Sequence, residues 1–199
     1  MKINLKINTL KAAAMCAAKN EIRIFLNGVC IDIKNDSQLV VIGTNGYIAF
    51  IGVENYEGEW GGKPEQIIIP IDAINAALKN RDKKIDYIVL EKINTEKMSL
   101  GNVLFNPIDA NYPDYARAIP KVKSVKTGIG HYPHEYLKIL DIALEEASGD
   151  RCPIFHQHGE NDAGVFTCYM PNYICLVMPI NKRDEAGAIP LYKGIELPK

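Results

Sequence analysis

The stretch FNPIDANYPDYARAIPK, residues 105–121, breaks a chain that otherwise alternates between strand-like and helix-like segments. Prolines bracket a run that contains two tyrosines and one arginine, Arg117. Proline fixes φ and removes a backbone donor, so such a run fits neither a central strand nor a helix interior. We interpret it as a connection that leaves one folded unit and enters the next, and the segments on both sides predict which fold it joins.

The composition is typical of a globular protein. The 199 residues are 47% apolar, which suits one large domain or one domain plus part of another. No run approaches the roughly 18 apolar residues of a membrane-spanning helix, and lysines interrupt the N-terminal segment, so we expect a cytoplasmic protein with no membrane partner. The net charge of −1 gives no global attraction to nucleic acid and leaves only a locally basic face to bind it. Five cysteines without CxxC spacing predict reduced thiols rather than a disulfide framework.

Three segments share a strand-to-helix pattern and predict helices that begin near residues 9, 71 and 133. The spacing is about 62 residues, which indicates an internal repeat. Thr9 is placed as the N-cap of the first helix, and Gly149 as the stop of the third. Strand-like segments, rich in β-branched and aromatic residues, lie at 2–8, 22–26, 28–34, 39–44, 47–53, 66–70, 85–92, 96–101, 102–105, 152–158, 164–170 and 173–180.

This order predicts an α+β fold of three strand–helix–strand repeats, with antiparallel sheets and the helices on one face. The glycine-rich stretch at residues 53–66 reads as an exposed connection between the first two repeats.

Three short motifs, in the same order, resemble those of the bacterial sliding clamp family (the DNA polymerase III beta subunit). EIRIFLNGVCIDI (21–33) followed by LVVIGTNGYIAF (39–50) is similar to the family's R-x-x-L-N-G…T-D-G-x-R-L-A segment. NYPDYARAIPK (111–121) resembles its F-P-D-Y-x-x-V-[IL]-P, and YICLVMPIN (173–181) its V-M-P-M-R. The resemblance covers most of residues 3–182. It implies a clamp-like domain at 1–120, equivalent to the family's middle domain, a half-domain at 121–182 and a C-terminal extension at 183–199.

The family encircles duplex DNA and takes short peptides from polymerases and the clamp loader in a hydrophobic groove. The resemblance therefore implies a sliding-clamp-like processivity protein with the same partners. Carried over residue by residue, the groove consists of Leu26, Thr44, Gly46, Tyr47, Pro113, Arg117, Ala118, Tyr136, Val177, Met178 and Pro179. Such a lining suits an apolar peptide anchor, although Leu26, Val177 and Met178 also fit an ordinary core.

The chain departs from the family pattern around the groove and in length. Asn45, Ile48 and Asn181 stand where the family has Asp, Arg and Arg. Three predicted repeats replace the family's six, and a half-domain leaves an unpaired sheet edge. Either two chains pair their third units or that unit packs in some other way. We expect a homo-oligomer, and if the third units pair, four chains complete a ring.

Cations near the first two helices are candidates for sequence-independent phosphate contacts. They are Lys11, Lys19, Lys79, Arg81, Lys83 and Lys84. The alternative is a favourable helix C-terminus followed by a solvated turn. The third helix carries Glu135, Asp141, Glu145 and Glu146, which would repel phosphate. A clamp-fold regulator that binds peptides without forming a ring is therefore the alternative function.

Two features lie outside the resemblance. CPIFHQH (152–158) would place Cys152, His156 and His158 on one strand face, with Cys168 nearby, and this makes a zinc-binding protein a further, weaker alternative. No nucleophile elbow, phosphate-binding loop or HExxH motif is present, so we expect no catalysis and no cofactor. The tail segment IPLY offers a leucine and an aromatic ring near the size of the family's peptide anchors, which could dock in the groove of its own chain or of a neighbour, although an extension that is flexible or strand-like is the simpler interpretation.

Overall fold

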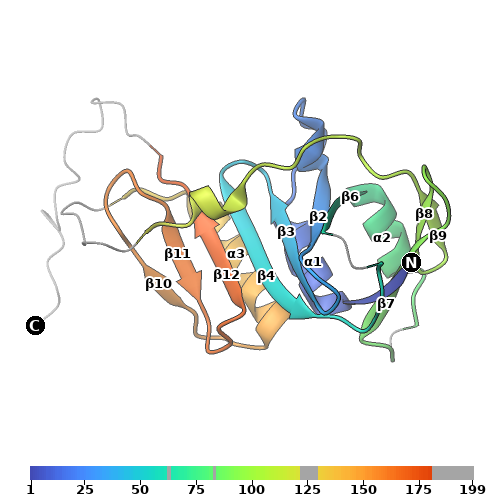
Figure 1. The fold of residues 1–199 in the computed structure, drawn as a ribbon. Helices are drawn as coiled ribbons and strands as arrows, with labels where there is room; N and C mark the ends of the chain where they lie inside the picture. The colour runs from blue at the N-terminus through green and yellow to red at the C-terminus, as the bar shows by residue number, and fades with distance from the viewer. Residues whose placement is uncertain (62–63, 83, 122–129, 181–199) are drawn as a thin grey trace, which may run out of the picture.

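A computed structural model describes residues 1–199 except 62–63, 83, 122–129 and 181–199. Within the described residues the chain forms an α+β fold of two antiparallel sheets and three α-helices (Figure 1). The helices are α1 (Ile7–Cys16), α2 (Ile71–Lys79) and α3 (His134–Ser148). All three fall where the apolar periodicity predicts them. None of the described helices is long and apolar enough to cross a membrane.

The smaller sheet has five strands in the order β5-β1-β7-β8-β9. Its strands are β1 (Lys2–Lys6), β5 (Gly58–Glu59), β7 (Tyr87–Lys92), β8 (Met98–Leu100) and β9 (Val103–Phe105). The larger sheet has seven strands in the order β10-β11-β12-β4-β3-β2-β6. Its strands are β2 (Gly28–Ile33), β3 (Gln38–Thr44), β4 (Ile48–Asn55), β6 (Glu65–Pro70), β10 (Ile154–His156), β11 (Gly164–Thr167) and β12 (Tyr173–Val177).

The strands around α1 and α2 exchange partners. β1, which leads into α1, pairs with β7, which follows α2. β6, which leads into α2, pairs with β2, which follows α1. This reciprocal pairing locks residues 1–105 into one unit that neither strand–helix segment could form alone.

The larger sheet continues across the connection at residues 105–121. β12 pairs antiparallel with β4, with Tyr173 opposite Gly52 and Val177 opposite Ile48. α3 packs against α1 and β12, and it buries Leu140, Ala143 and Leu144. The apolar face of the third helix is therefore covered within one chain, and the two edge strands of the sheet are the short strand β10 and β6.

The seven-stranded sheet is buried on both faces in its middle. On one side α1 and α3 cover residues such as Val41, Phe50 and Val177. On the other side Ile42, Leu176 and their neighbours pack under the connection, which crosses that face. This double burial explains why β2 is apolar or buried at every position rather than alternating.

Three sequence expectations are wrong in detail. Thr9 is not an N-cap but a buried residue inside α1, whose N-cap is Lys6. Residues 22–26 do not form a strand; the short 3₁₀ helix η1 (Ile24–Asn27) occupies most of this range. The stretch at 53–66 is not simply an exposed connection, because it contains β5 and the buried Trp60, whose Nε1 donates to Glu65.

Two other expectations concern residues that lie partly or wholly outside the described part of the chain. Residues 130–133, just before α3, are not a strand, and 122–129 lie outside the described residues. The extension at 183–199 also lies outside them. The domain boundaries and the count of three repeats stay predictions.

Candidate peptide-binding pocket

A small apolar cavity lies where β3, β4, β12, η1 and the connection meet. Its volume is about 270 Å³. Leucine, isoleucine, alanine and aromatic side chains make up most of its wall, with Arg23 and Asp114 as its charged members. The lining residues are Arg23, Phe25, Leu26, Ile42, Thr44, Gly46, Ala49, Ile51, Tyr112, Pro113, Asp114, Tyr115, Ala118 and Leu176.

Tyr115 fastens the outer wall of the pocket to the sheet. It lies in the 3₁₀ helix η2 (Tyr115–Ala118), and its hydroxyl donates to Asp32 Oδ2 on β2 at 2.8 Å. Lys34 forms an ion pair with the same carboxylate and lies 5.5 Å from the centre of the Tyr115 ring. Asp32 is only 4% exposed, so both partners offset the cost of burying its charge. Burial raises the pKa of Tyr115, which keeps the hydroxyl protonated and able to donate.

Tyr112 forms the floor beside η1. Its ring meets that of Phe25 edge-on, with the centroids 6.5 Å apart, an arrangement that aromatic pairs favour. Burial strongly raises the pKa of Tyr112. Its hydroxyl lies 3.4 Å from the Ile42 carbonyl oxygen, which is long for an O–H···O bond. Tyr112 therefore serves the pocket mainly as an apolar surface.

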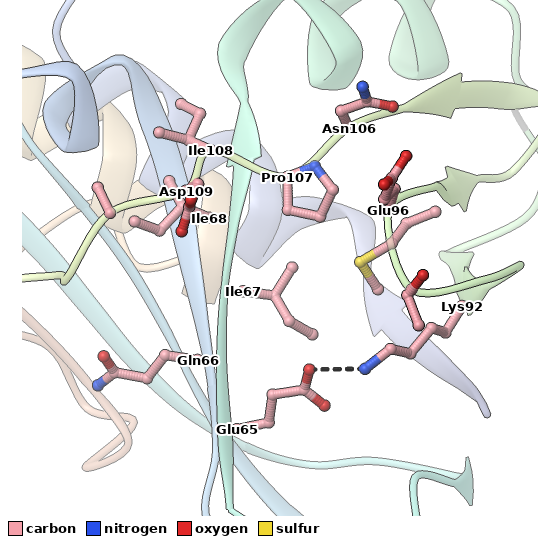
Figure 2. Close-up of a pocket in the computed structure, with 13 residues that line it drawn as sticks. Glu65, Gln66, Ile67, Ile68, Lys92, Glu96, Asn106, Pro107, Ile108 and Asp109 are labelled. Atoms are coloured by element: carbon pink, nitrogen blue, oxygen red, sulfur yellow. Dashed lines mark hydrogen bonds and ion pairs between the residues drawn. The ribbon is translucent and has the colours of Figure 1, made fainter.

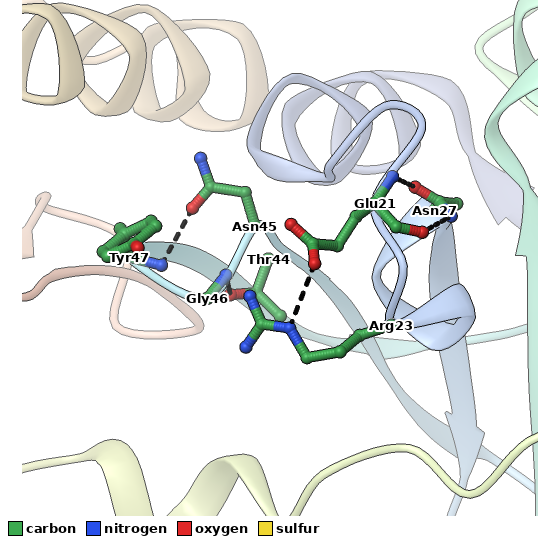
Figure 3. Close-up of polar contacts among 7 residues, drawn as sticks. All are labelled: Glu21, Arg23, Asn27, Thr44, Asn45, Gly46 and Tyr47. Carbon is green, nitrogen blue, oxygen red and sulfur yellow. Dashed lines mark hydrogen bonds and ion pairs between the residues drawn. The ribbon is translucent and has the colours of Figure 1, made fainter.

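The turn between β3 and β4 forms the rim (Figure 3). Asn45 Oδ1 accepts hydrogen bonds from the backbone N–H groups of Tyr47 and Ile48, both at 2.9 Å. An aspartate would accept the same bonds, so Asn45 preserves the turn without the charge. Thr44 Oγ1 accepts from Gly46 N–H at 3.0 Å and donates to the Ile48 carbonyl at 2.6 Å. Gly46 has φ +92°, a conformation that glycine adopts without strain.

Arg23 lies over this turn. A Cβ on Gly46 would stand 3.1 Å from Arg23 Nη2. Glu21 accepts from Arg23 Nε at 3.3 Å, and this hydrogen bond is the main cause that lowers the pKa of the Glu21 carboxyl. Asn27 exchanges hydrogen bonds with the Glu21 backbone at 2.8 Å, which holds the segment leading to Arg23 (Figure 3). The pocket mouth therefore carries a positioned, half-exposed guanidinium.

Structural comparison identifies the fold. A DNA polymerase III beta subunit from Thermotoga maritima matches with a TM-score of 0.71 at 14% identity, over 92% of this chain and 66% of that one. The Pseudomonas aeruginosa beta subunit gives 0.72 at 12% identity, over 92% and 66%. The Bacillus subtilis sliding clamp gives 0.71 at 15%, over 92% and 65%. The fold is that of the bacterial sliding clamp.

The likeness is one of structure and not of sequence. The sequence matches no protein-family model and no curated protein. The chain spans just under two thirds of the length of the clamps it matches.

Five of the groove residues expected from the clamp resemblance line the pocket. These residues are Leu26, Thr44, Gly46, Pro113 and Ala118. The motifs that carry the resemblance therefore converge in space, although they are far apart in sequence.

The other six expected groove residues lie elsewhere. The ring of Tyr47 stacks on that of Tyr136 of α3, with centroids 6.0 Å apart, and Tyr47 accepts the Met178 N–H through its carbonyl oxygen at 2.8 Å. Val177 is fully buried on the helix side of the sheet. Pro179 follows Met178 outside the pocket lining, and Arg117 pairs with Asp114 at 3.0 Å on the surface.

Residues that the motif comparison missed make up the rest of the wall. Leu176, not Val177, faces the pocket, because neighbouring residues of a strand point to opposite faces. The alternation of β12 was the signal that identifies Leu176. Arg23 and Phe25 were missed because their segment was expected to be a strand, whereas Phe25 lies in the 3₁₀ helix η1 and Arg23 directly precedes it.

One of the residues predicted to contact DNA forms an ion pair within the chain. Lys11 of α1 forms an ion pair with Glu146 of α3 at 2.8 Å. Lys19, Lys79 and Lys84 are exposed, Arg81 is half-buried and donates to the Ile85 carbonyl at 3.3 Å, and Lys83 lies outside the described residues. The three helices together carry three lysines against five carboxylates, namely Lys11, Lys79 and Lys138 against Asp72, Glu135, Asp141, Glu145 and Glu146.

A larger cavity of about 460 Å³ lies between β6 and the β7–β8 turn (Figure 2). Glu65 and Lys92 form an ion pair at 2.8 Å across it, and Glu96 and Asp109 also line it. Its wall mixes charged and polar side chains with apolar ones such as Ile67 and Met98, whereas the wall of the pocket under the connection is mostly apolar. We therefore take the smaller pocket as the candidate site.

The zinc alternative loses its geometric basis. β10 spans only Ile154–His156, so the alternation expected to align Cys152, His156 and His158 does not extend far enough. His156 Nε2 lies 2.8 Å from Thr167 Oγ1, and Cys168 Sγ lies 3.3 Å from the Met170 carbonyl. Among the residues that the structure describes, no three His, Cys, Asp or Glu side chains are grouped to hold a metal ion.

Proposed function

We propose that this chain is a non-enzymatic, clamp-like accessory protein of DNA replication that tethers a polymerase or another partner through the pocket under the connection. The observation that carries the proposal is the position of this pocket in a clamp fold, at the junction of β4, β12 and the connection. Its mechanism is tethering, which raises the local concentration of a partner without changing a chemical barrier.

The size and chemistry of the pocket favour a peptide anchor over a drug-sized ligand. A volume of about 270 Å³ is below the usual range of about 300–1,000 Å³ for drug-sized ligands. It suits one or two large apolar side chains of an extended peptide. Arg23 at the mouth supplies a donor for a backbone carbonyl or a carboxylate of the same peptide.

Peptide titration tests this part of the proposal. A panel of short peptides with leucine and aromatic anchors, taken from polymerases and clamp loaders, is titrated calorimetrically into the protein. Ala118→Arg fills the pocket mouth from an exposed position, and Ala116→Arg puts the same charge on η2 outside the lining. We expect peptide binding that Ala118→Arg abolishes and Ala116→Arg preserves. Binding that both variants retain would place the peptide elsewhere.

The replication role further requires a ring or another way to stay on DNA. We propose that two chains pair through their third units and that four chains complete a ring. Light scattering behind size exclusion, over a wide concentration range, tests this assembly. Retention on circular duplex DNA that falls steeply with salt tests the DNA contact.

The second candidate is a regulator of replication that keeps the clamp fold and binds peptides without a ring. Two observations favour it: Lys11 is already paired with Glu146, and the helices carry more carboxylates than lysines. A monomer that binds peptides and is not retained on DNA at any salt concentration would select this candidate.

A further inference from the structure

The described chain ends beside the pocket. Leu176 lines the pocket, and the Met178 N–H donates to the carbonyl of Tyr47, next to the lining residue Gly46. Ile180, the last described residue before the end of the chain, donates its N–H to the His131 carbonyl at 2.8 Å. Ile180 lies four positions after Leu176, so it is within about 14 Å of a pocket residue along the chain.

The sequence beyond Ile180 contains a segment that matches the pocket in chemistry. Residues 181–188 are NKRDEAGA, which is mostly polar and small. Residues 189–192 then read Ile-Pro-Leu-Tyr, three large apolar or aromatic side chains with a proline among them. Proline restricts the unbound segment, so less conformational entropy is lost when an extended segment binds.

We infer that residues 189–192 dock in the pocket of their own chain, with Leu191 and Tyr192 as the anchors. This inference rests on the proposed function of the pocket as a peptide site, and it identifies a segment of the same chain as the peptide that occupies the pocket when no partner is bound. A partner peptide then has to displace the tail, so the tail lowers the apparent affinity of the pocket for that peptide.

Chain length favours the same chain over a second copy. A chain segment of eight residues has a root-mean-square span of about 16 Å and can extend to nearly twice that. Its effective concentration at the pocket is on the order of 1 mM. At micromolar protein concentration the intramolecular contact therefore prevails over docking into a neighbour.

The central experiment compares the full chain with a chain that ends after Ala186. A labelled peptide of residues 186–195 is titrated into both at several protein concentrations. We expect it to bind the shortened chain and to bind the full chain more weakly, by a factor of one plus the effective concentration divided by the peptide's dissociation constant. For a dissociation constant of about 100 μM the factor is about ten.

Alanine methyl spectra locate the contact. Ala49 and Ala118 line the pocket, whereas Ala77 of α2 lies outside it. We expect the methyl signals of Ala49 and Ala118, and not that of Ala77, to differ between the full and shortened chains. Equal peptide affinity and identical pocket signals in the two chains would overturn the inference.

Matched substitutions identify the anchors. Leu191→Ala and Tyr192→Ala in the full chain are expected to restore peptide affinity to that of the shortened chain. Leu197 lies in the same tail beyond the docked segment. Leu197→Ala is therefore expected to leave peptide affinity as weak as in the full chain. If Leu197→Ala opens the pocket and Leu191→Ala does not, the assignment of residues 189–192 is wrong. A difference between full and shortened chains that grows with protein concentration indicates a second copy and also contradicts the inference.

The experiment separates this inference from the proposed function. If polymerase or clamp-loader peptides bind the full and shortened chains equally, the pocket is a peptide site and the tail does not occupy it. If the tail peptide binds the shortened chain and Ala118→Arg abolishes that binding while no partner peptide binds, the tail inference stands and the tethering function fails.

Discussion

The hydroxyl of Tyr173 donates a hydrogen bond to Glu54 Oε1 at 3.1 Å, which joins β12 to β4. Thr9 of α1 also donates to this carboxylate oxygen, and Lys6 Nζ lies 3.8 Å from it. The Glu54 side chain is 2% exposed. A buried carboxylate with partners from β1, α1 and β12 therefore fixes how the third helix and its strands pack on the first unit.

Tyr173→Phe removes one of these partners and keeps the ring, which stacks on Phe50 with centroids 5.9 Å apart. We expect a loss of about 1–3 kcal/mol in the free energy of unfolding, because a buried charged acceptor loses a donor. Urea denaturation measures the change. Tyr87→Phe is the control, since the Tyr87 side chain is largely exposed on β7. Equal effects of the two substitutions would show that the Glu54 contact adds nothing.

Glu54 also makes stability depend on pH. Burial raises the pKa of its carboxyl, while the hydrogen bond from Thr9 and the charge of Lys6 act in the opposite direction. A carboxyl with a higher pKa in the folded state binds its proton more tightly when folded. Its stabilising contribution is therefore full below the unfolded-state value of about 4.3 and is lost as pH rises through the folded pKa.

Glu54→Gln keeps an acceptor for Thr9 and Tyr173 and removes the titration. We expect wild type to lose stability relative to Glu54→Gln as pH rises from about 4 to 7. Denaturation of both proteins across this range measures the difference in stability. The contributions of the other titrating groups cancel because both proteins contain them. A wild type that gains on the variant over the same range would mean that Lys6 and the hydrogen bonds outweigh burial.

Local patterns predicted the elements better than their packing. The helices follow from apolar periodicity, and Gly149 ends α3 with φ +74° as its position indicated. The role of Thr9 could not be predicted, because its partners Glu54 and Tyr173 lie 45 and 164 residues away. The pairing of β12 with β4 is similarly non-local, and nothing in either strand specifies the other.

The sequence motifs likewise predicted some residues of the candidate site and missed others. Motif resemblance located Leu26, Gly46 and Ala118, because short sequence patterns mark the turns and the connection. It assigned Val177 in place of Leu176, since a motif fixes position along the chain and not which face of a strand a side chain takes.

Substitution of Tyr115 tests whether its hydrogen bond from the connection to the sheet is needed for peptide binding in the pocket. Tyr115→Phe breaks the 2.8 Å bond to Asp32, which is buried and keeps its ion pair with Lys34. We expect a loss of about 1–3 kcal/mol in stability and weaker peptide binding. Tyr112→Phe is the matched comparison, because its hydroxyl makes only the 3.4 Å contact, and we expect a smaller effect. Denaturation and calorimetric titration measure both quantities. A larger effect at Tyr112 would contradict this account.

Gly46 carries the last prediction, since both its backbone and its neighbour restrict substitution. Gly46→Ala puts a side chain at φ +92° and its Cβ 3.1 Å from Arg23 Nη2, so the Arg23 guanidinium has to shift at the pocket mouth by a few tenths of an ångström. Gly149→Ala imposes a similar positive φ, with no atom within 4 Å of the new Cβ. We expect both substitutions to cost about 1–2 kcal/mol of stability through backbone strain, and only Gly46→Ala to weaken peptide binding. Binding that survives Gly46→Ala at full strength would show that the position of Arg23 does not matter to the pocket, and binding lost equally in both variants would trace the effect to general destabilisation.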